Sequence, residues 1–260
     1  MKVRIKFAKY GALKFIGHLD VMRYMQKVIR KSEIDVAYSQ GFNPHQLLYF
    51  ASPLGVGLTS EGEYFDIVLN SSEPDIVKKL NANSVEGIKI LDAVVLDDKA
   101  KNSMSIIAAA KYIIALKDEY ADTFACSYDE FVAKFNEYMA LPQMLVNKKT
   151  KKSEREIDLK PLIFDWDLDY GKYIDGNDKY GIQTEIWENN TSNFDNKIGA
   201  YMYLHAGSEE NLKAEFVMES FCDWCGIEFV PHAFQVHRID MLAKNEADEL
   251  VSLMDIDNMK

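Results

Sequence analysis

The residues best suited to chemistry lie early in the chain, in the motifs His18-Leu19-Asp20 and GFNPH (41–45). An acid in the first turn of a helix is stabilised by the helix dipole, whereas a histidine there loses basicity. A neutral imidazole can bind a substrate or a metal, so His18, Asp20 and His45 have the residue types of a general acid–base group or a metal site. No spacing requires the two histidines to meet, and a simpler interpretation pairs Asp20 with Arg23 one turn later.

The GFNPH motif predicts a turn that displays Phe42 and His45. Gly41 allows positive φ, Pro44 fixes its own φ, and Asn43 is kept out of the helical region by the proline that follows it. Such a loop can place a ring, an imidazole and free backbone N–H groups around an anion or a planar group. The alternative is an ordinary connection between a helix and a strand, because short turn motifs often occur without function.

Two cysteines, Cys222 and Cys225, form a single CxxC without a second pair at zinc-finger spacing. A metal there would need Cys126 or a histidine such as His232 or His237 as a further ligand. Cysteines three residues apart on a helix more often behave as small, partly buried hydrophobic residues, so we expect no metal. Three cysteines cannot form a disulfide framework and suit a reducing compartment.

The elements that carry these motifs can be predicted from periodicity. Residues 2–8 alternate between apolar and cationic side chains, as in a strand with one buried face, and residues 18–31 have the spacing of an amphipathic helix. Further strands are expected at 47–51, 63–69 and 87–96, and a second helix at 72–80. On the first helix, Asp20, Arg23, Lys27 and Lys31 follow one face.

This order, β-α-β-β-α-β, is the ferredoxin-like arrangement. We expect it to repeat with strands at 106–116, 144–147, 201–205 and 229–237 and helices at 128–139 and 212–225. The sequence therefore predicts an α+β fold of two ferredoxin-like lobes in tandem, 1–100 with the HLD and GFNPH motifs and 101–260. The second lobe carries an insertion at about 164–199, in which we expect a strand near 183–187.

In a ferredoxin-like lobe the helices cover one sheet face and leave the other open. If Val3, Ile5 and Phe7 pack under the helices, the cations of the same strand project from the open face beside Tyr64 and Asp66. Cations beside an aromatic ring suit a phosphate backbone with unstacked bases. The alternative is a solvated sheet face, because the aromatic signature of RNA-recognition strands is absent. The cations in question are Lys2, Arg4 and Lys6.

Charge is segregated along the 260 residues, whose net charge is −11. Residues 1–60 hold nine Lys and Arg against three Asp and Glu, so the remainder is strongly acidic apart from a basic island at 148–155. The composition, 48% hydrophobic and 27% charged, is that of an ordinary globular protein. No apolar run is long enough for a membrane helix, and the N-terminus lacks a signal-peptide core, so we expect a cytoplasmic protein without a membrane partner.

A long register of residues in the first 70 positions resembles the radical-SAM-associated (radical-SAM-linked) family of uncharacterised bacterial proteins. Its members are similar to domains fused to, or encoded with, radical SAM enzymes, and no settled activity comes with the family. The chain has no CxxxCxxC loop, so S-adenosylmethionine and an iron–sulfur cluster are expected only in the partner. The residues that carry the resemblance are Phe7, Lys9, Gly11, His18 to Asp20, Arg23, Arg30, Tyr38, Ser39, Gly41 to His45, Pro53, Leu54, Gly57, Ser60, Glu63, Tyr64 and Asp66.

The sequence and the resemblance together predict an accessory binding module that recognises RNA, with tRNA the first candidate, for a radical SAM enzyme. The alternatives are an RNA-modifying enzyme that uses Asp20 with His18 or His45, and a protein-docking subunit without a nucleic-acid ligand. No Walker loop, dinucleotide fingerprint, nucleophile elbow or HExxH helix indicates another activity. The expected phosphate contacts are Lys2, Arg4, Lys6, Arg23 and Lys27, and the expected pocket residues are Tyr38, Ser39, Gly41, Phe42, Asn43, Pro44, His45, Ser60 and Tyr64.

Overall fold

The computed structural model describes residues 1–97, 99–149, 154–175, 179–180, 182–188, 190, 192–208 and 210–256. Within these residues the fold is mixed α+β, built on one large sheet with the strand order β4-β1-β3-β10-β5-β9-β8. Strand β2 pairs with β3 outside this path, and β11 pairs with β10. The described pairings are antiparallel except the one between β3 and β10, which is parallel.

The first half of the chain follows the predicted order of elements. Alternating apolar and charged residues form β1, the amphipathic segment forms α1, and the three remaining strands and the second helix come in the expected sequence. Between β1 and α1 there is a short 3-10 helix, Gly11–Phe15. The bounds are β1 Lys2–Lys9, α1 His18–Lys31, β2 Leu48–Phe50, β3 Thr59–Val68, α2 Ile76–Ala82 and β4 Ile88–Leu96.

One difference between the second half and the prediction is the strand that lies beside β9. The expected strand 144–147 is present as β6, but β6 pairs with β7 in a separate hairpin, and β8 takes the sheet position beside β9. The reason is that β8 offers an aromatic ring to each face, Trp166 against Phe135 and Phe164 against Tyr203. The bounds are β5 Ile107–Leu116, α3 Tyr128–Ala140, β6 Leu145–Lys149, β7 Glu154–Asp158, β8 Ile163–Asp167, β9 Gly199–His205, α6 Ala214–Cys225, β10 Phe234–Lys244 and β11 Leu250–Ser252.

The prediction of a strand near 183–187 is wrong, because this segment forms the helix α5 (Gln183–Glu188). Ile182 and Ile186 are fully buried and pack on Ala8 and Tyr10 of the first half. Side chains four residues apart lie on one face of a helix, whereas in a strand they need a longer, flat surface. A second short helix, α4 (Gly171–Asp175), precedes it.

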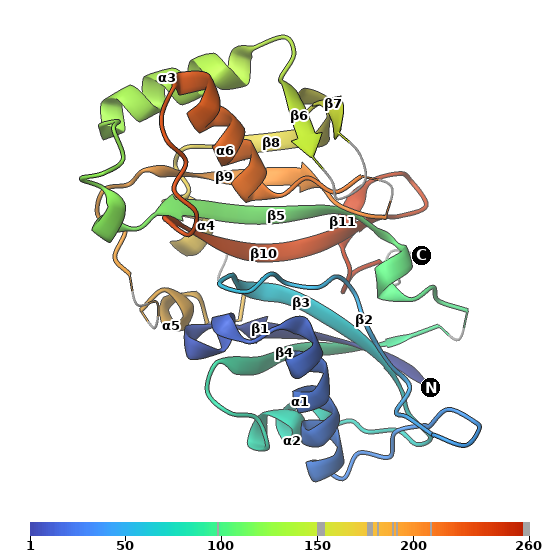
Figure 1. The fold of residues 1–260 in the computed structure, drawn as a ribbon. Coiled ribbons are helices and arrows are strands. Elements are labelled where there is room, and N and C mark those ends of the chain that lie inside the picture. Colours follow the sequence, from blue (N-terminus) through green and yellow to red (C-terminus); the bar gives the residue numbers. More distant parts are fainter. Residues whose placement is uncertain are drawn as a thin grey trace.

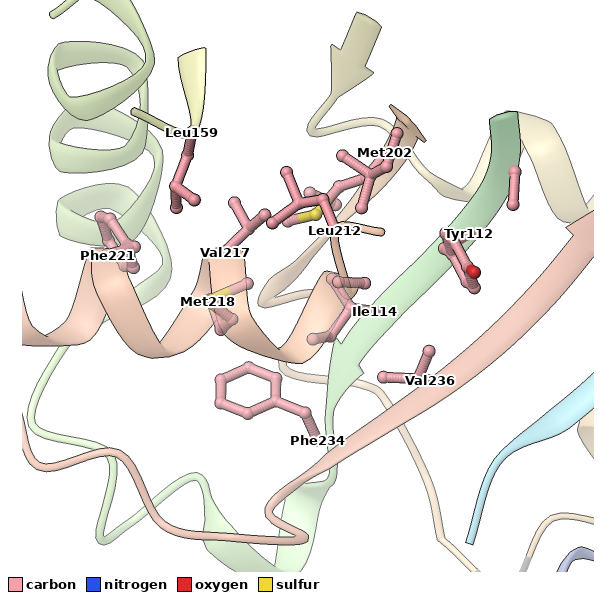
Figure 2. Packing of buried hydrophobic residues seen from close by; sticks show 14 of the residues in the cluster. Tyr112, Ile114, Leu159, Met202, Leu212, Val217, Met218, Phe221, Phe234 and Val236 are labelled. Atoms are coloured by element: carbon pink, nitrogen blue, oxygen red, sulfur yellow. The ribbon is translucent and has the colours of Figure 1, made fainter. Parts of the chain in front are cut away.

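Helices α1, α2, α3 and α6 cover one face of the sheet (Figure 1). Val3, Ile5 and Phe7 of β1 pack against α1 and α2, and alternate residues of β5 pack under α3 and α6. Figure 2 shows this second core, where Val217 and Met218 of α6 lie near Ile114 of β5 and Phe221 lies beside α3. No helix in the described part of the chain has both the length and the apolar character needed to cross a bilayer.

The opposite face of the first half is not open, so the prediction of an exposed row of cations is wrong. Arg4 is fully buried and its guanidinium bonds to Asp66 and to the backbone oxygens of Lys101 and Leu253. The segment after β4 and the C-terminal segment therefore cover this face at one end. At the other end α5 covers it, where Tyr10 donates a hydrogen bond of 2.5 Å to Glu185.

Candidate functional site

The connection between α1 and β2 is a clamped, exposed turn. Ser39 N–H donates to the His45 oxygen at 2.8 Å, and the Ser39 hydroxyl lies 2.8 Å from His45 Nδ1. Gly41 has φ 112°, the positive value that the motif predicts. Phe42 stands at the tip with its ring fully exposed. Hydrogen bonds thus join the two ends of the turn, while the Phe42 ring is exposed to solvent.

The basic stripe of α1 lies beside this turn. Gln46 Nε2 donates to the Gln26 oxygen at 3.3 Å, which brings the chain after the turn against the middle of α1. Arg23 and Arg30 lie three residues before and four residues after Gln26, on the same face of the helix. Both are exposed, as is Lys27. We call this set, Arg23, Lys27 and Arg30 of α1 with Tyr38, Phe42 and His45 of the turn, the loop–helix surface.

The three catalytic candidates are not brought together. The His18 ring meets Phe50 edge-on with 5.4 Å between centroids, whereas His45 is bonded to Ser39. An extended chain from His45 to Phe50 spans roughly 16 Å. Asp20 is exposed and forms an ion pair with Arg23 at 3.3 Å, the simpler of the two interpretations.

His18 lies instead at the edge of a buried charge cluster, which we define as Lys9, His18, Glu63 and Arg238. Arg238 Nη2 lies 2.6 Å and 2.7 Å from the two Glu63 oxygens, and both side chains are buried. Burial lowers the pKa of Lys9, against the attraction of Glu63, and its ammonium bonds to the oxygen of Ile16 at 3.2 Å. Because Arg238 and Glu63 pair with each other, this cluster joins β3 to β10.

The pH dependence of stability gives a test of where His18 lies. Burial lowers the pKa of His18 below its usual 6.5, with Glu63 acting in the opposite direction. The unfolded chain then takes up the proton first, so the contribution of His18 is present above pH 6.5 and is lost as the pH falls below it. We expect the free energy of unfolding to fall more between pH 7.5 and pH 5.5 in the wild type than in His18→Gln, as measured by urea titration. His45→Gln, at an exposed histidine, is the control variant. If the free energy of unfolding falls equally in the wild type and in His18→Gln, the described burial of His18 is wrong.

Several predicted binding residues lie inside the protein rather than on its surface. Lys6 forms an ion pair with Asp240 at 3.2 Å, and the Tyr64 hydroxyl donates a hydrogen bond to the same carboxylate. Ser60 donates to the Arg238 oxygen at 2.9 Å. Lys2, which is partly exposed, donates to Asn102 at 2.6 Å. Together with the buried Arg4, these five residues do not form the exposed nucleic-acid face that was predicted. For Arg4, Lys6 and Tyr64 the missed signal is an acid on another strand, Asp66 or Asp240.

The CxxC pair packs in the core of the second half. Cys222 is fully buried, and burial raises the pKa of its thiol to about 12. Cys225 is partly buried, and its pKa is also raised by burial. Since metals bind the thiolate, a raised pKa disfavours binding. Among the described residues, no three His, Cys, Asp or Glu side chains are grouped as a metal site.

The basic island at 148–155 falls on the hairpin β6–β7. Arg155 pairs with Glu210 at 2.8 Å. Lys151 and Lys152 lie outside the described residues. Arg155 therefore has an acidic partner within the chain.

In a comparison with protein-family models, residues 2–214 match a family described as an uncharacterized protein conserved in bacteria, DUF2344. The chain belongs to the DUF2344 family. The matched residues of this DUF2344 chain include the whole loop–helix surface and every strand of the sheet up to β9, and they end at the start of α6. No curated protein matches the chain.

Proposed function

We propose that this DUF2344 chain is an accessory binding module that holds RNA, in the first instance tRNA, for a radical SAM enzyme. The RNA binds at the loop–helix surface. The observation that carries the proposal is the fully exposed Phe42 on a clamped turn beside the exposed cations of α1.

The chemistry of this surface suits a single-stranded or looped RNA. Arg23, Lys27 and Arg30 supply cations for phosphates, which account for most of the affinity of a protein for nucleic acid. Phe42 and Tyr38, which is also exposed, supply rings on which unstacked bases can pack. The chain as a whole is acidic, so this local excess of cations directs a polyanion to one place.

The radical SAM partner rests on the family resemblance of the first 70 residues. In this proposal S-adenosylmethionine and the iron–sulfur cluster belong to the partner, and both proteins act in the cytoplasm. Exposed apolar side chains near the start of α1, Phe15, Leu19 and Val56, are suited to contact with another protein. Gly57 N–H donates to the Lys14 oxygen at 2.8 Å, which holds Val56 near Phe15.

The strand orders support a tandem of ferredoxin-like lobes. The first half has the order β4-β1-β3-β2 and the second β10-β5-β9-β8, so in both halves the strands lie in the order fourth, first, third, second. Tandem lobes of this kind recur in RNA-processing and RNA-modifying enzymes, which is an argument from analogy of fold. The separation of His18, Asp20 and His45 argues against the alternative of an enzyme built on these residues.

Reversal of two charges tests the RNA site. We expect Arg23→Glu with Lys27→Glu to weaken RNA retention at least tenfold, because two phosphate contacts become repulsive. The tagged protein is recovered from its native cells at modest salt, and the nucleic acid that co-purifies with it is measured. Lys78→Glu with Lys99→Glu changes the net charge equally at exposed positions elsewhere and serves as the control.

Phe42→Ala separates base stacking from charge. Loss of one stacked base costs about 1–3 kcal/mol, so this variant is expected to bind RNA several-fold to a hundredfold less tightly. Because Phe42 is fully exposed, its removal leaves the fold intact.

Retention of RNA that is the same in wild type and in the Arg23/Lys27 variant would refute the proposed site. Recovery of a radical SAM protein without RNA would support the docking subunit instead.

A further inference from the structure

A pocket of about 280 Å³ lies where the two halves of the chain meet. The 3-10 helix and the loop before β3 form one side of it, and the end of β5, the start of α6 and the loop before β10 form the other. Its size is at the lower end of pockets that hold small molecules. We call it the junction pocket, and it shares no residue with the loop–helix surface. Its apolar lining is Phe15, Val56, Leu58, Phe229, Pro231 and Phe234, and its charged lining is Lys14, Lys117 and Glu215.

Lys14 is a buried cation without a counter-charge. Its side chain is 3% exposed, and its ammonium donates to two neutral amide oxygens, Asn190 Oδ1 at 2.8 Å and Gln235 Oε1 at 3.2 Å. Among the residues that the structure describes, no carboxylate lies within ion-pair distance of this ammonium. A buried charge is costly unless an opposite charge accompanies it, and buried lysines are nearly always paired for this reason. An anion in the junction pocket would supply the charge that the chain itself does not provide.

Lys117 places a second and more accessible ammonium at the same pocket. It is half-buried and donates to the His232 oxygen at 2.7 Å, and a lysine ammonium has three donors. Burial lowers the pKa of Lys14, and the nearby charge of Lys117 lowers it further against the attraction of Glu119. Within the described part of the chain Glu119 forms no ion pair with either lysine, and its carboxylate accepts from the Ser192 hydroxyl at 3.2 Å. The two cations therefore act together on an anion in the pocket.

The rest of the lining indicates which class of anion fits. Glu215 is the only acid among the described residues that line the pocket, so the two lysines leave one positive charge in excess. One positive charge suits a monoanion such as a carboxylate better than a phosphate dianion. Phe15 and Val56 are 62% and 55% exposed, and the Lys14 ammonium lies 5.3 Å from the centroid of the Phe15 ring. A ligand with a charged end and an apolar body matches this combination.

We propose that the junction pocket binds an organic carboxylate whose body is apolar and of the size of an amino-acid side chain. The carboxylate accepts a charge-assisted hydrogen bond from the Lys117 ammonium, and the buried Lys14 adds the attraction of an uncompensated charge. The apolar body packs against Phe15, Val56 and Phe229. The same chemistry is offered by a small free acid and by the C-terminal residue of a polypeptide.

Titration calorimetry at low salt with N-acetyl-L-leucine as the probe tests the pocket. N-acetyl-L-leucinamide differs from this probe only in the group that carries the charge, and we expect the acid to bind about tenfold more tightly or better. Lys117→Met is expected to abolish this difference, whereas Lys117→Arg keeps the charge and should retain most of the affinity. Lys134→Met, at a half-buried lysine of α3 that does not line the pocket, is the matched control.

Lys14→Met tests the contribution of the buried charge. We expect it to weaken binding of N-acetyl-L-leucine about tenfold, because the uncompensated cation is lost while the apolar stem is kept. The variant also removes a donor from Asn190 and Gln235, so its circular dichroism spectrum and thermal midpoint are measured before the titration. If Lys14→Met does not fold, Lys117→Met at its more accessible position decides the test.

Two further probes distinguish the sources of the carboxylate. Tighter binding of 4-methylpentanoate than of the peptide acetyl-Gly-Gly-Leu assigns the pocket to small free acids, and the reverse order assigns it to a chain terminus. The proposal is overturned if wild type binds N-acetyl-L-leucine no more tightly than its amide at millimolar concentration, or if inorganic phosphate binds more tightly than the acid. It is also overturned if Lys117→Met binds the acid as tightly as wild type. None of these measurements involves Arg23 or Lys27, so failure of the proposed RNA site would leave them unaffected.

Discussion

Replacing Asp66 by alanine is expected to lower the free energy of unfolding by about 3–5 kcal/mol, because it leaves a buried guanidinium without its counter-charge. Arg4 is fully buried, and its Nε lies 2.8 Å from Asp66 Oδ1. Asp66 also accepts a hydrogen bond from Ser103 N–H at 2.7 Å, so the variant also loses this bond between the segment after β4 and the sheet. Urea unfolding at neutral pH measures the change.

The exposed ion pair of the same half provides the control. Asp20 and Arg23 are 3.3 Å apart with most of both side chains in solvent, so Asp20→Ala is expected to cost at most about 1 kcal/mol. The double change Arg4→Met with Asp66→Leu removes both charges and is expected to recover most of the lost stability. If Asp66→Ala costs no more than Asp20→Ala, the buried pair does not contribute as described.

Gly62→Ala is expected to separate the two halves of the sheet. A Cβ at this position would lie 2.5 Å from the Asp240 Cα and 2.6 Å from the Ile239 oxygen, and both of these are backbone atoms. Strand β3 must therefore move away from β10, where the register pairs His237 with Thr59. Overpacking of this kind costs about 3 kcal/mol or more when backbone must shift.

Thermal unfolding and limited proteolysis measure this effect. At roughly 2–4 °C per kcal/mol for a chain of this size, the midpoint of Gly62→Ala should fall by about 6–12 °C. Gly55→Ala is the matched control, since its Cβ would meet only the flexible end of Leu58 at 3.4 Å. An unchanged midpoint of thermal unfolding in Gly62→Ala would show that β3 and β10 do not approach as closely as described at this position.

The features predicted correctly from the sequence are those that depend on neighbours along the chain. The alternation in 2–8 and the helical spacing in 18–31 are local patterns, and they appear as β1 and α1. The GFNPH turn follows from the conformational freedom of Gly41, which adopts a positive φ, and from the fixed φ of Pro44. The exposed stripe of Arg23 and Lys27 follows from the same helical period.

The fate of the other cations was decided by contacts distant in sequence. Arg4 and Asp66 are 62 residues apart, and Lys6 and Asp240 are 234 apart. Periodicity places Arg4 and Lys6 on one side of a strand, but it cannot say what covers that side. The same limit explains α5, whose helical form depends on burial of Ile182 and Ile186 against β1.

The sequence of this chain was sufficient for its first elements, its turn and the exposed part of its basic surface, because backbone preference and periodicity act within a few residues. The tertiary structure alone decided which cations are neutralised and which strand completes the second half of the sheet. These outcomes depend on register and on segments folded over the sheet, since a charge is buried only when a distant part of the chain supplies its partner.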